Sequence, residues 1–200
     1  MYDDPSDPTK DTAQKYLIRK KTNNIHLIQN EIGDRRGVVN AIKTGIKKAK
    51  GEAIVITMAD LSDDVTQIDE MYSLIHQGYD IVAASRYMPG GEKIGGPFIK
   101  TLLSKTAGLT LYWLFKVPTH DATNAYKMYR RRIFKDIEIE STGGFEYSLE
   151  ITLKAFKKGY RITEIPTEWH DDPKGKSHFK LWAWLPKYIK TYLLVMQKPQ

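Results

Sequence analysis

The chain has 200 residues, of which 41% are hydrophobic, no cysteine and a formal net charge of +7. This length and composition suit one globular domain, or one domain with an appendage. The lack of cysteine excludes a disulfide framework and a thiolate metal site, and it fits a cytosolic or cytosol-facing protein. The surplus of positive charge favours an anionic partner, which can be nucleic acid, a nucleotide phosphate or an acidic membrane surface.

Strand and helix patterns alternate in the first half of the chain. Short strands are expected at 24–31, 52–59 and 79–87, where β-forming apolar residues gather. Helices are expected at 37–49 and 63–78, because apolar residues recur every three to four positions and a glycine stops each pattern. Such alternation favours βαβ units and a parallel sheet, whose ligands bind outside the carboxyl ends of the strands.

The second half of the chain is more helical and more basic. It has no internal repeat and no low-complexity linker. We therefore expect one continuous domain over 1–180, followed by a C-terminal amphipathic helix over 181–200. The elements expected here are a glycine-rich loop at 88–96, an apolar helix at 98–117, a strand and a basic helix start within 119–137, an amphipathic helix at 143–159, an edge strand at 160–169 and an aromatic, basic stretch at 179–196 that contains Pro186.

Two stretches, 98–117 and 179–196, mix Trp, Tyr and Leu with Lys. This mixture is typical of helices that lie in the headgroup region of a membrane. The alternative is that their apolar faces pack on the core or on a second subunit. No apolar run reaches the roughly 18 residues that suggest a membrane span, so we expect peripheral attachment.

Three carboxylates, Asp60, Asp63 and Asp64, follow the apolar stretch "IVITM". Short acidic side chains often cap helices, because they accept hydrogen bonds from nearby backbone N–H groups. Oxygen clusters at the carboxyl end of a strand also hold divalent cations and phosphorylated ligands. Asp60 and Arg86 both fall at the carboxyl ends of predicted strands, which favours ligand chemistry for this pair.

Six motifs in a fixed order resemble the family-2 glycosyltransferases. They are "YDDPSDPT", "GEAIVITMADLSDD", "YDIVAASRYMPGG", "DATNAYKMYRR", "GGFEYSLEI" and "YRITEIPTEWHDDPKGKSHFK", and they cover nearly the whole chain. The branch that they resemble most is the polyprenyl-phosphate sugar synthases, of the dolichol-phosphate mannosyltransferase kind. The resemblance implies an α/β GT-A fold with a Rossmann-like nucleotide-binding half, and transfer of a sugar from a nucleotide-sugar, often with Mg²⁺ or Mn²⁺.

The family's metal-binding DxD motif falls on Met58, Ala59 and Asp60, so this sequence keeps only the second carboxylate. The position two residues later, which can add a metal ligand, is Ser62. The resemblance therefore implies a cation bound by Asp60, Ser62 and the diphosphate of the donor. Asp64 and, with it, Asp63 are expected to cap the following helix, where a carboxylate suits the helix dipole.

The resemblance assigns further roles by position. The acceptor phosphate is expected to be already ionised, so the site needs charge neutralisation and positioning more than a strong base. Glu146 stands at a position that is commonly polar or acidic near the acceptor. The alternative to a role at the acceptor is that Glu146 is a buried residue at the start of a helix. The implied roles are nucleotide-sugar binding by Asp3, Asp4, Asp60 and Arg86, acceptor-phosphate binding by Lys100, Ser104, Lys174 and Lys176, and catalysis by Asp60, Arg86 and Glu146, with Asp121 and Asn124 in the family's "DxxxGF" segment.

One departure from the family concerns the acceptor phosphate. The "R-x-x-G-x-S-K" segment, whose Arg and Lys hold phosphate, is replaced here by "DDPKGKSHF". Asp172 stands at the arginine position and His178 at the lysine position, so Lys174 and Lys176 are the candidates to substitute.

The leading hypothesis is a glycosyltransferase that moves a hexose from a GDP- or UDP-sugar to a polyprenyl phosphate, at the cytosolic face of a membrane. The alternative is a catalytically weakened relative that binds nucleotide-sugar or a partner without turnover, as Met58 and Asp172 suggest. A phospho-receiver domain is shorter and does not explain residues 120–180. No nucleic-acid docking motif is recognisable, so we expect no nucleic-acid partner.

The family's first strand and its Pro/Asn/Glu loop precede the "DD" motif by about thirty residues, whereas this chain opens at that motif. We therefore expect an N-terminally incomplete GT-A domain, which exposes unpaired backbone groups of its sheet or relies on a partner chain for the strand.

Overall fold

The computed structural model describes residues 1–2, 8–20, 24–30, 37–171 and 181–197, and it divides into two compact units, 1–50 and 51–200. The first unit contains α1 (Pro8–Lys20) and α2 (Val38–Lys48). Tyr2 and Gln29 form an isolated parallel bridge there, in place of the strand expected at 24–31. The helix expected at 37–49 is confirmed by α2.

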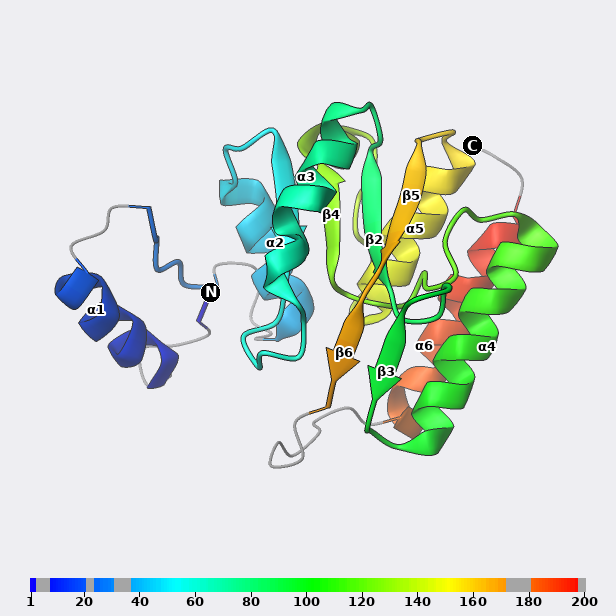
Figure 1. Cartoon of the computed structure of the whole chain (residues 1–200), viewed down its shortest axis with the longest axis horizontal. Helices are drawn as coiled ribbons and strands as arrows, with labels where there is room; N and C mark the ends of the chain where they lie inside the picture. Colours follow the sequence, from blue (N-terminus) through cyan, green and yellow to red (C-terminus); the bar gives the residue numbers. More distant parts are fainter. Residues whose placement is uncertain (3–7, 21–23, 31–36, 172–180, 198–200) are drawn as a thin grey trace. The chain divides into compact units, whose positions relative to one another are not determined.

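The second unit is built on a mixed four-stranded sheet of β1 (Ala53–Ile56), β4 (Lys127–Arg130), β2 (Ile81–Ser85) and β5 (Ile162–Pro166), in that order (Figure 1). Strand β4 runs antiparallel to both of its neighbours, and only β2 and β5 pair in parallel. The expectation of a purely parallel sheet is therefore wrong. Although α4 lies between β2 and β4 in the sequence, the chain re-enters the sheet at the end where β2 leaves it, so β4 runs back along β2.

Both faces of this sheet are covered by helices. The five residues of β2 are all buried, as in a strand packed on both sides. Helix α3 (Ile68–His76), preceded by the short 3-10 turn η1 (Val65–Gln67), places Met71 and Ile75 against one face. Helix α5 (Glu146–Lys157) lies behind the sheet in Figure 1 and buries nearly all of its residues. These elements confirm the helices expected at 63–78 and 143–159.

The helices expected at 98–117 and within 179–196 are α4 (Phe98–Phe115) and α6 (Leu181–Tyr192), the latter extended by η3 (Leu193–Met196). They lie side by side (Figure 1), and the hydroxyls of Thr110 and Tyr192 are 2.8 Å apart. Helix α6 continues through Pro186, so the proline does not end it. Among the helices that the structure describes, none is both long and apolar enough to cross a bilayer.

A two-stranded parallel ribbon of β3 (Glu92–Ile94) and β6 (Glu168–His170) extends from the main sheet. The sequence predicted a loop where β3 forms and one edge strand where the chain makes β5 and then β6. The basic helix start expected within 119–137 is the 3-10 turn η2 (Arg131–Lys135). The ribbon matters for function because it forms one wall of the cavity described next.

Candidate active site

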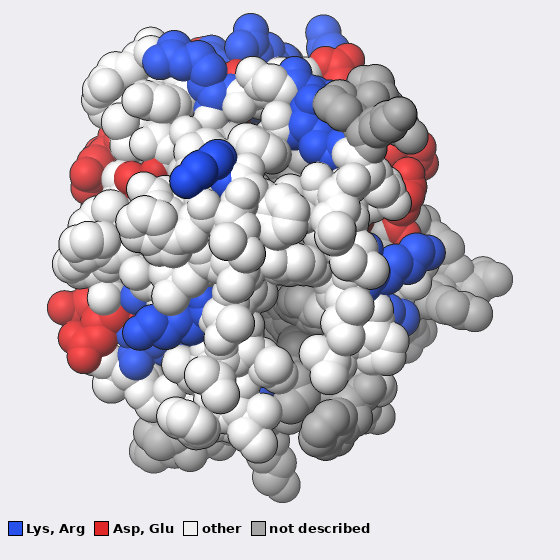
Figure 2. All heavy atoms as spheres, turned by 90° about the vertical axis from the view of Figure 1, so that its right-hand side faces the viewer, with Lys and Arg blue, Asp and Glu red and all other residues white. Residues whose placement is uncertain are grey.

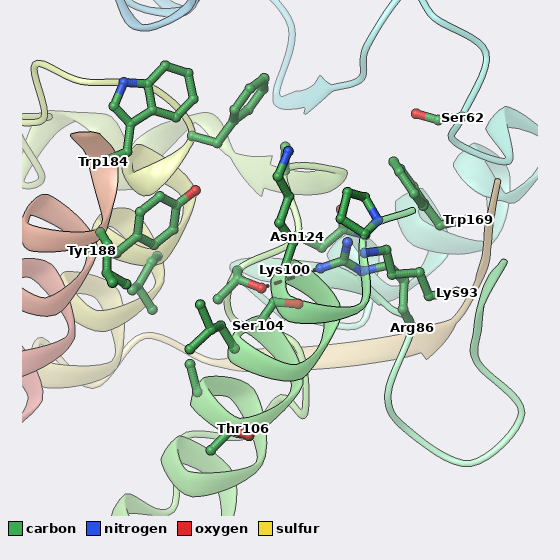
Figure 3. A pocket seen from close by; sticks show the side chains of 18 of the residues that line it. Ser62, Arg86, Lys93, Lys100, Ser104, Thr106, Asn124, Trp169, Trp184 and Tyr188 are labelled. Atoms are coloured by element: carbon green, nitrogen blue, oxygen red, sulfur yellow. Dashed lines mark hydrogen bonds between the residues drawn. The ribbon is translucent and has the colours of Figure 1, made fainter. Parts of the chain in front are cut away.

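A cavity of about 830 Å³ opens between α4, α6, the β3–β6 ribbon and the loops that follow β1 and β2. Figure 3 shows its two ends: Trp184 and Tyr188 of α6 lie on one side, and Ser62, Arg86, Lys93 and Trp169 on the other. Lys100, Ser104 and Asn124 lie between them. The cavity therefore joins a polar end to an apolar end. The apolar end is lined by Leu103, Ala107, Phe145, Leu149, Trp184, Leu185, Tyr188, Ile189 and Tyr192.

Asp60 and Ser62 lie together at the polar end, as the sequence predicted. Oδ1 of Asp60 accepts hydrogen bonds from the backbone N–H of Ser62, at 3.1 Å, and from its hydroxyl, at 2.6 Å. The residue between them, Leu61, has a φ of 61° and is exposed. This left-handed turn brings the two polar side chains to the same side of the loop.

The capping role predicted for Asp63 is wrong. Its side chain turns back toward β1, where Oδ2 accepts from the hydroxyl of Thr57, at 3.0 Å, and from the backbone N–H of Met58, at 3.1 Å. Burial raises the pKa of Asp63, and the charge of Asp60 acts in the same direction. Asp63 lines the cavity and thus places a second carboxylate beside Met58, where the family motif has its first.

Asp64 makes the helix cap that the sequence predicted. Its Oδ1 accepts from the backbone N–H of Thr66, at 3.0 Å, and from the hydroxyl of Thr66, at 2.6 Å, at the start of η1. The two neighbouring aspartates therefore differ in role, since Asp64 faces the helix and Asp63 faces the cavity.

The donor set fits a hard divalent cation in part. Asp60, Ser62 and Asp63 offer carboxylate and hydroxyl oxygens, the ligand type that Mg²⁺ and Mn²⁺ prefer. Within the described ranges, no three His, Cys, Asp or Glu side chains are grouped closely enough to hold a metal ion. A cation at this place would therefore need further oxygens from a bound substrate, such as those of a diphosphate group.

Arg86 lines the polar end and forms a bidentate ion pair with Asp121. Its Nε lies 2.6 Å from Oδ2 and its Nη2 3.0 Å from Oδ1 of that carboxylate. Burial alone would raise the pKa of Asp121, but the charge and hydrogen bonds of Arg86 outweigh burial and lower it. The charge of Arg86 is thus compensated inside the protein, and its guanidinium carbon lies 5.9 Å from the centroid of the Trp169 ring.

The loop that carries Asp121 is held by hydrogen bonds from Lys127, a fully buried residue of β4. The Nζ of Lys127 donates to the carbonyls of Ala122 and Asn124 and, at 2.6 Å, to the hydroxyl of Ser148. Burial lowers the pKa of Lys127 to about 7. Asn124 lines the cavity, and its side-chain amide donates to the carbonyl of Ala84 at 2.8 Å.

The side chain of Glu146 is buried at the start of α5, as in the alternative to catalysis that the sequence left open. Its carboxylate is buried and accepts hydrogen bonds from the backbone N–H groups of Gly143 and Gly144, both at 2.7 Å. The residue does not line the cavity. This geometry stabilises the turn before α5, and the catalytic role of Glu146 stays a prediction.

Lys100 and Ser104 lie one turn apart on α4 and both line the cavity, as predicted. The hydroxyl of Ser104 donates to the carbonyl of Thr101 at 3.1 Å, and the hydroxyl of Tyr87 lies 2.5 Å from Ser104 Oγ. The predicted sites Asp3, Asp4, Lys174 and Lys176, with Asp172 and His178, lie outside the described residues, so their roles stay predictions.

Sequence reasoning missed two cavity residues of the ribbon, Lys93 and Trp169. Lys93 lies in the glycine-rich stretch 88–96, which the sequence predicted to be a loop. Trp169 was placed in an edge strand without a role. No local pattern could have found them, because they meet Arg86 only through the pairing of β3 with β6.

Comparison with known proteins bears on this site. The family model described as "Glycosyl transferase family 2" matches residues 1–138 of the chain. The chain belongs to glycosyl transferase family 2. This membership confirms the family resemblance that the six motifs indicated.

Two relatives in this family are lipid-phosphate sugar transferases by name. The chain is 28% identical over 131 residues to a polyprenol monophosphomannose synthase of Mycolicibacterium smegmatis, which covers 64% of this chain and 49% of that protein. It is 26% identical over 182 residues to a dolichol-phosphate mannosyltransferase of Pyrococcus furiosus, which covers 89% of this chain and 49% of that protein. The chain thus spans about half the length of these curated relatives.

The fold is also similar to solved structures of glucosyl-3-phosphoglycerate synthase from Mycobacterium tuberculosis. One of them, in complex with Mn²⁺, UDP and glucosyl-3-phosphoglycerate, has a TM-score of 0.69 at 12% identity and covers 99% of this chain and 68% of that one. Another is in complex with Mg²⁺ and UDP. At this identity the likeness concerns the fold alone, and it confirms the expected GT-A architecture.

Proposed function

We propose that this chain transfers a hexose from a GDP- or UDP-sugar to the phosphate of a polyprenyl phosphate. The observation that carries the proposal is the cavity with two unlike ends. Arg86, Lys93 and Lys100 surround the polar end, and apolar side chains of α4 and α6 line the other. An amphiphilic acceptor, with a phosphate head and an isoprenoid chain, has the same division of charge and apolar surface.

The proposed reaction is a displacement at the sugar. An oxygen of the acceptor phosphate forms a bond to the anomeric carbon while the bond from that carbon to the donor's diphosphate breaks, and the nucleoside diphosphate leaves with the electron pair. The acceptor is already an anion, so no proton has to be removed. The protein's task is to hold two negatively charged groups in line and to offset their repulsion with nearby cations.

In this proposal Asp60, Ser62 and Asp63 would hold a Mg²⁺ or Mn²⁺ ion that offsets charge on the donor's diphosphate. Lys100 would contact the acceptor phosphate, and Ser104 would donate or accept a hydrogen bond beside it. Arg86 would act mainly through its positive charge at a fixed position. Its Nε and Nη2 already donate to Asp121, so this edge of the guanidinium cannot also hold a phosphate.

We further propose that α4 and α6 rest on the cytosolic face of a membrane. On α4 the exposed side chains include Phe98, Leu102, Trp113 and Leu114, and the exposed Lys105 lies among them on the same helix. Figure 2 shows this side of the molecule as a broad uncharged area with Lys and Arg grouped around it and Asp and Glu at its margins. Apolar side chains with a basic surround suit a bilayer with anionic headgroups.

The test is a transfer assay with the purified chain, Mn²⁺ and a panel of acceptors. GDP-mannose and UDP-glucose are each offered with a short polyprenyl phosphate, with the matching polyprenol, and with 3-phosphoglycerate. Sugar incorporated only into the polyprenyl phosphate supports the proposal. Transfer to 3-phosphoglycerate alone would contradict it.

The assay also separates the rival class, a relative that binds nucleotide-sugar without turnover. Met58 in place of a carboxylate is the observation that favours this class. Binding of GDP or UDP with Mn²⁺, measured by calorimetry, together with no incorporation into any acceptor, would establish the rival and reject transfer.

A further inference from the structure

Lys93 occupies the centre of β3 and faces the polar end of the cavity (Figure 3). Its register partner across the ribbon is Trp169 of β6, and its Nζ lies 5.3 Å from the centroid of that indole. The same Nζ donates a hydrogen bond of 2.7 Å to the hydroxyl of Thr101, in the first turn of α4. The ammonium group is therefore held in place by two neutral partners.

Within the described residues, Lys93 forms no ion pair, although Asp171 also lines the cavity. Arg86, whose guanidinium carbon lies 5.9 Å from the centroid of the same Trp169 ring, is paired with Asp121. No carboxylate of the described residues lies within 4.0 Å of Lys93 Nζ. Lys100, which lies between the two ends of the cavity, adds a second lysine to the same lining. A cation without an ion pair is costly to keep half-buried unless an anion binds beside it.

The electrostatics of the free protein agree with this geometry. Burial lowers the pKa of Lys93, and the positive charges of Arg86 and Lys100 lower it further, whereas Asp171 and Asp121 act in the opposite direction. A bound anion would reverse the shift, because it favours the charged form of the lysine. The charged form of Lys93 is thus more favourable when an anion is bound than in the free protein.

We propose that Lys93 is a phosphate-binding residue of this cavity and contacts an oxygen of a phosphate or diphosphate ligand directly. The inference rests on the proposed function for the identity of that ligand, which is either the diphosphate of the donor or the phosphate of the acceptor. Lys93 would supply, from the ribbon, a cation that this sequence does not supply at Asp172, where the family pattern has arginine. The alternative is that Lys93 only ties the ribbon to α4 through Thr101 and Trp169.

The two roles are separated by three variants of the full chain. K93M keeps the length of the side chain against Trp169 but removes its charge and its donors. K93R keeps the charge. K105M is the matched control, because Lys105 lies on the exposed side of α4 and does not line the cavity.

Calorimetry with Mn²⁺ measures the dissociation constants of GDP, UDP, inorganic pyrophosphate, farnesyl phosphate and farnesol. We expect K93M to raise the dissociation constant at least tenfold for the phosphate ligands of one source, and K93R and K105M to change it less than threefold. Loss for GDP or UDP assigns Lys93 to the donor, and loss for farnesyl phosphate assigns it to the acceptor. Binding of farnesol, which has no phosphate, should stay unchanged in all three variants.

A pH series adds a readout that a structural tie would not move. Between pH 7 and pH 9.5 the wild type should lose affinity for the phosphate ligand as Lys93 loses its proton, and K93R should not, because arginine stays charged. Equal affinities of K93M and wild type would overturn the inference, as would an equal loss of farnesol binding or no phosphate binding by the wild type. A tenfold loss of pyrophosphate binding by K93M would support it even if the transfer assay showed no activity.

Discussion

The two ends of the cavity are built on different principles. At the polar end, charged side chains are fixed by many specific partners, as Arg86 and Asp121 show with their two charge-assisted hydrogen bonds. At the apolar end, α4 and α6 line the cavity mainly with aliphatic and aromatic side chains, and the hydroxyls of Thr110 and Tyr192 lie 2.8 Å apart. The comparison teaches that the first end can select a ligand by charge and position, whereas the second selects by length and shape.

The variant D121N should give the largest effect, at the polar end. It leaves the guanidinium of Arg86 buried without its counter-ion, a change that typically costs about 3–5 kcal/mol. We expect the free energy of unfolding in urea to fall by this amount, and nucleotide binding to be lost with it. D69N, which removes an exposed carboxylate of α3, is the control and should cost less than about 1 kcal/mol. Equal stability of D121N and wild type would show that the pair adds nothing to the polar end.

A second pair of variants divides the acidic cluster. D60A should abolish Mn²⁺-dependent binding of the nucleotide-sugar, because Asp60 faces the cavity. D64A should cost only about 1 kcal/mol of stability, because Asp64 caps η1. Calorimetry with and without Mn²⁺ measures the first effect and urea unfolding the second. The same loss of donor affinity in both variants would refute this division.

At the apolar end, A107W should block the chain of the acceptor. Ala107 lies on α4 one turn beyond Ser104 and lines the cavity. An indole there displaces apolar groups of the ligand, each worth about 0.8 kcal/mol per buried CH₂, so three of them correspond to roughly a fiftyfold loss. We expect this rise in KM for a long polyprenyl phosphate, with GDP and pyrophosphate binding unchanged. L114W, at an exposed position outside the cavity, is the control.

The buried lysine beneath the polar end should make stability depend on pH. The pKa of Lys127 is about 7 in the folded protein and 10.5 in its ordinary state, so between these values the unfolded chain holds a proton that the folded protein lacks. Stability should therefore rise with pH in this range, by up to about 1.4 kcal/mol per pH unit. Urea unfolding from pH 7 to pH 9 should show this rise in the wild type and not in K127M.

The smallest effect is expected at the surface of α4 that we propose to contact a membrane. Trp113 is 62% exposed on α4 and, in our proposal, enters the headgroup region. W113S should weaken binding to anionic vesicles by about 1 kcal/mol, or roughly fivefold, since only part of the ring leaves water. Y72S on α3 is the control, because Tyr72 lies on a different helix. Failure of the wild type to sediment with anionic vesicles at low salt would contradict the membrane proposal.

The sequence predicted most helices because each depends on local periodicity and a local stop. The glycine that follows the apolar pattern of α3 is Gly78, and it adopts a φ of 96° in the structure. The direction of β4 was not predictable in this way, because antiparallel pairing with β1 and β2 is decided by the path of the chain before it. Asp63 was misassigned for the same reason, since its contact with Met58 depends on a turn at Leu61 that no periodicity shows.

Gly108 allows α4 to pack directly against the backbone of the loop that carries Asp121. A Cβ at this position would lie 2.1 Å from the carbonyl oxygen of His120, so α4 rests directly on the backbone next to Asp121 with no side chain as a cushion. Close-packed backbones transmit displacement rather than absorb it. A displacement of α4 toward the sheet would therefore also move the loop of Asp121 and the guanidinium of Arg86 that this loop holds.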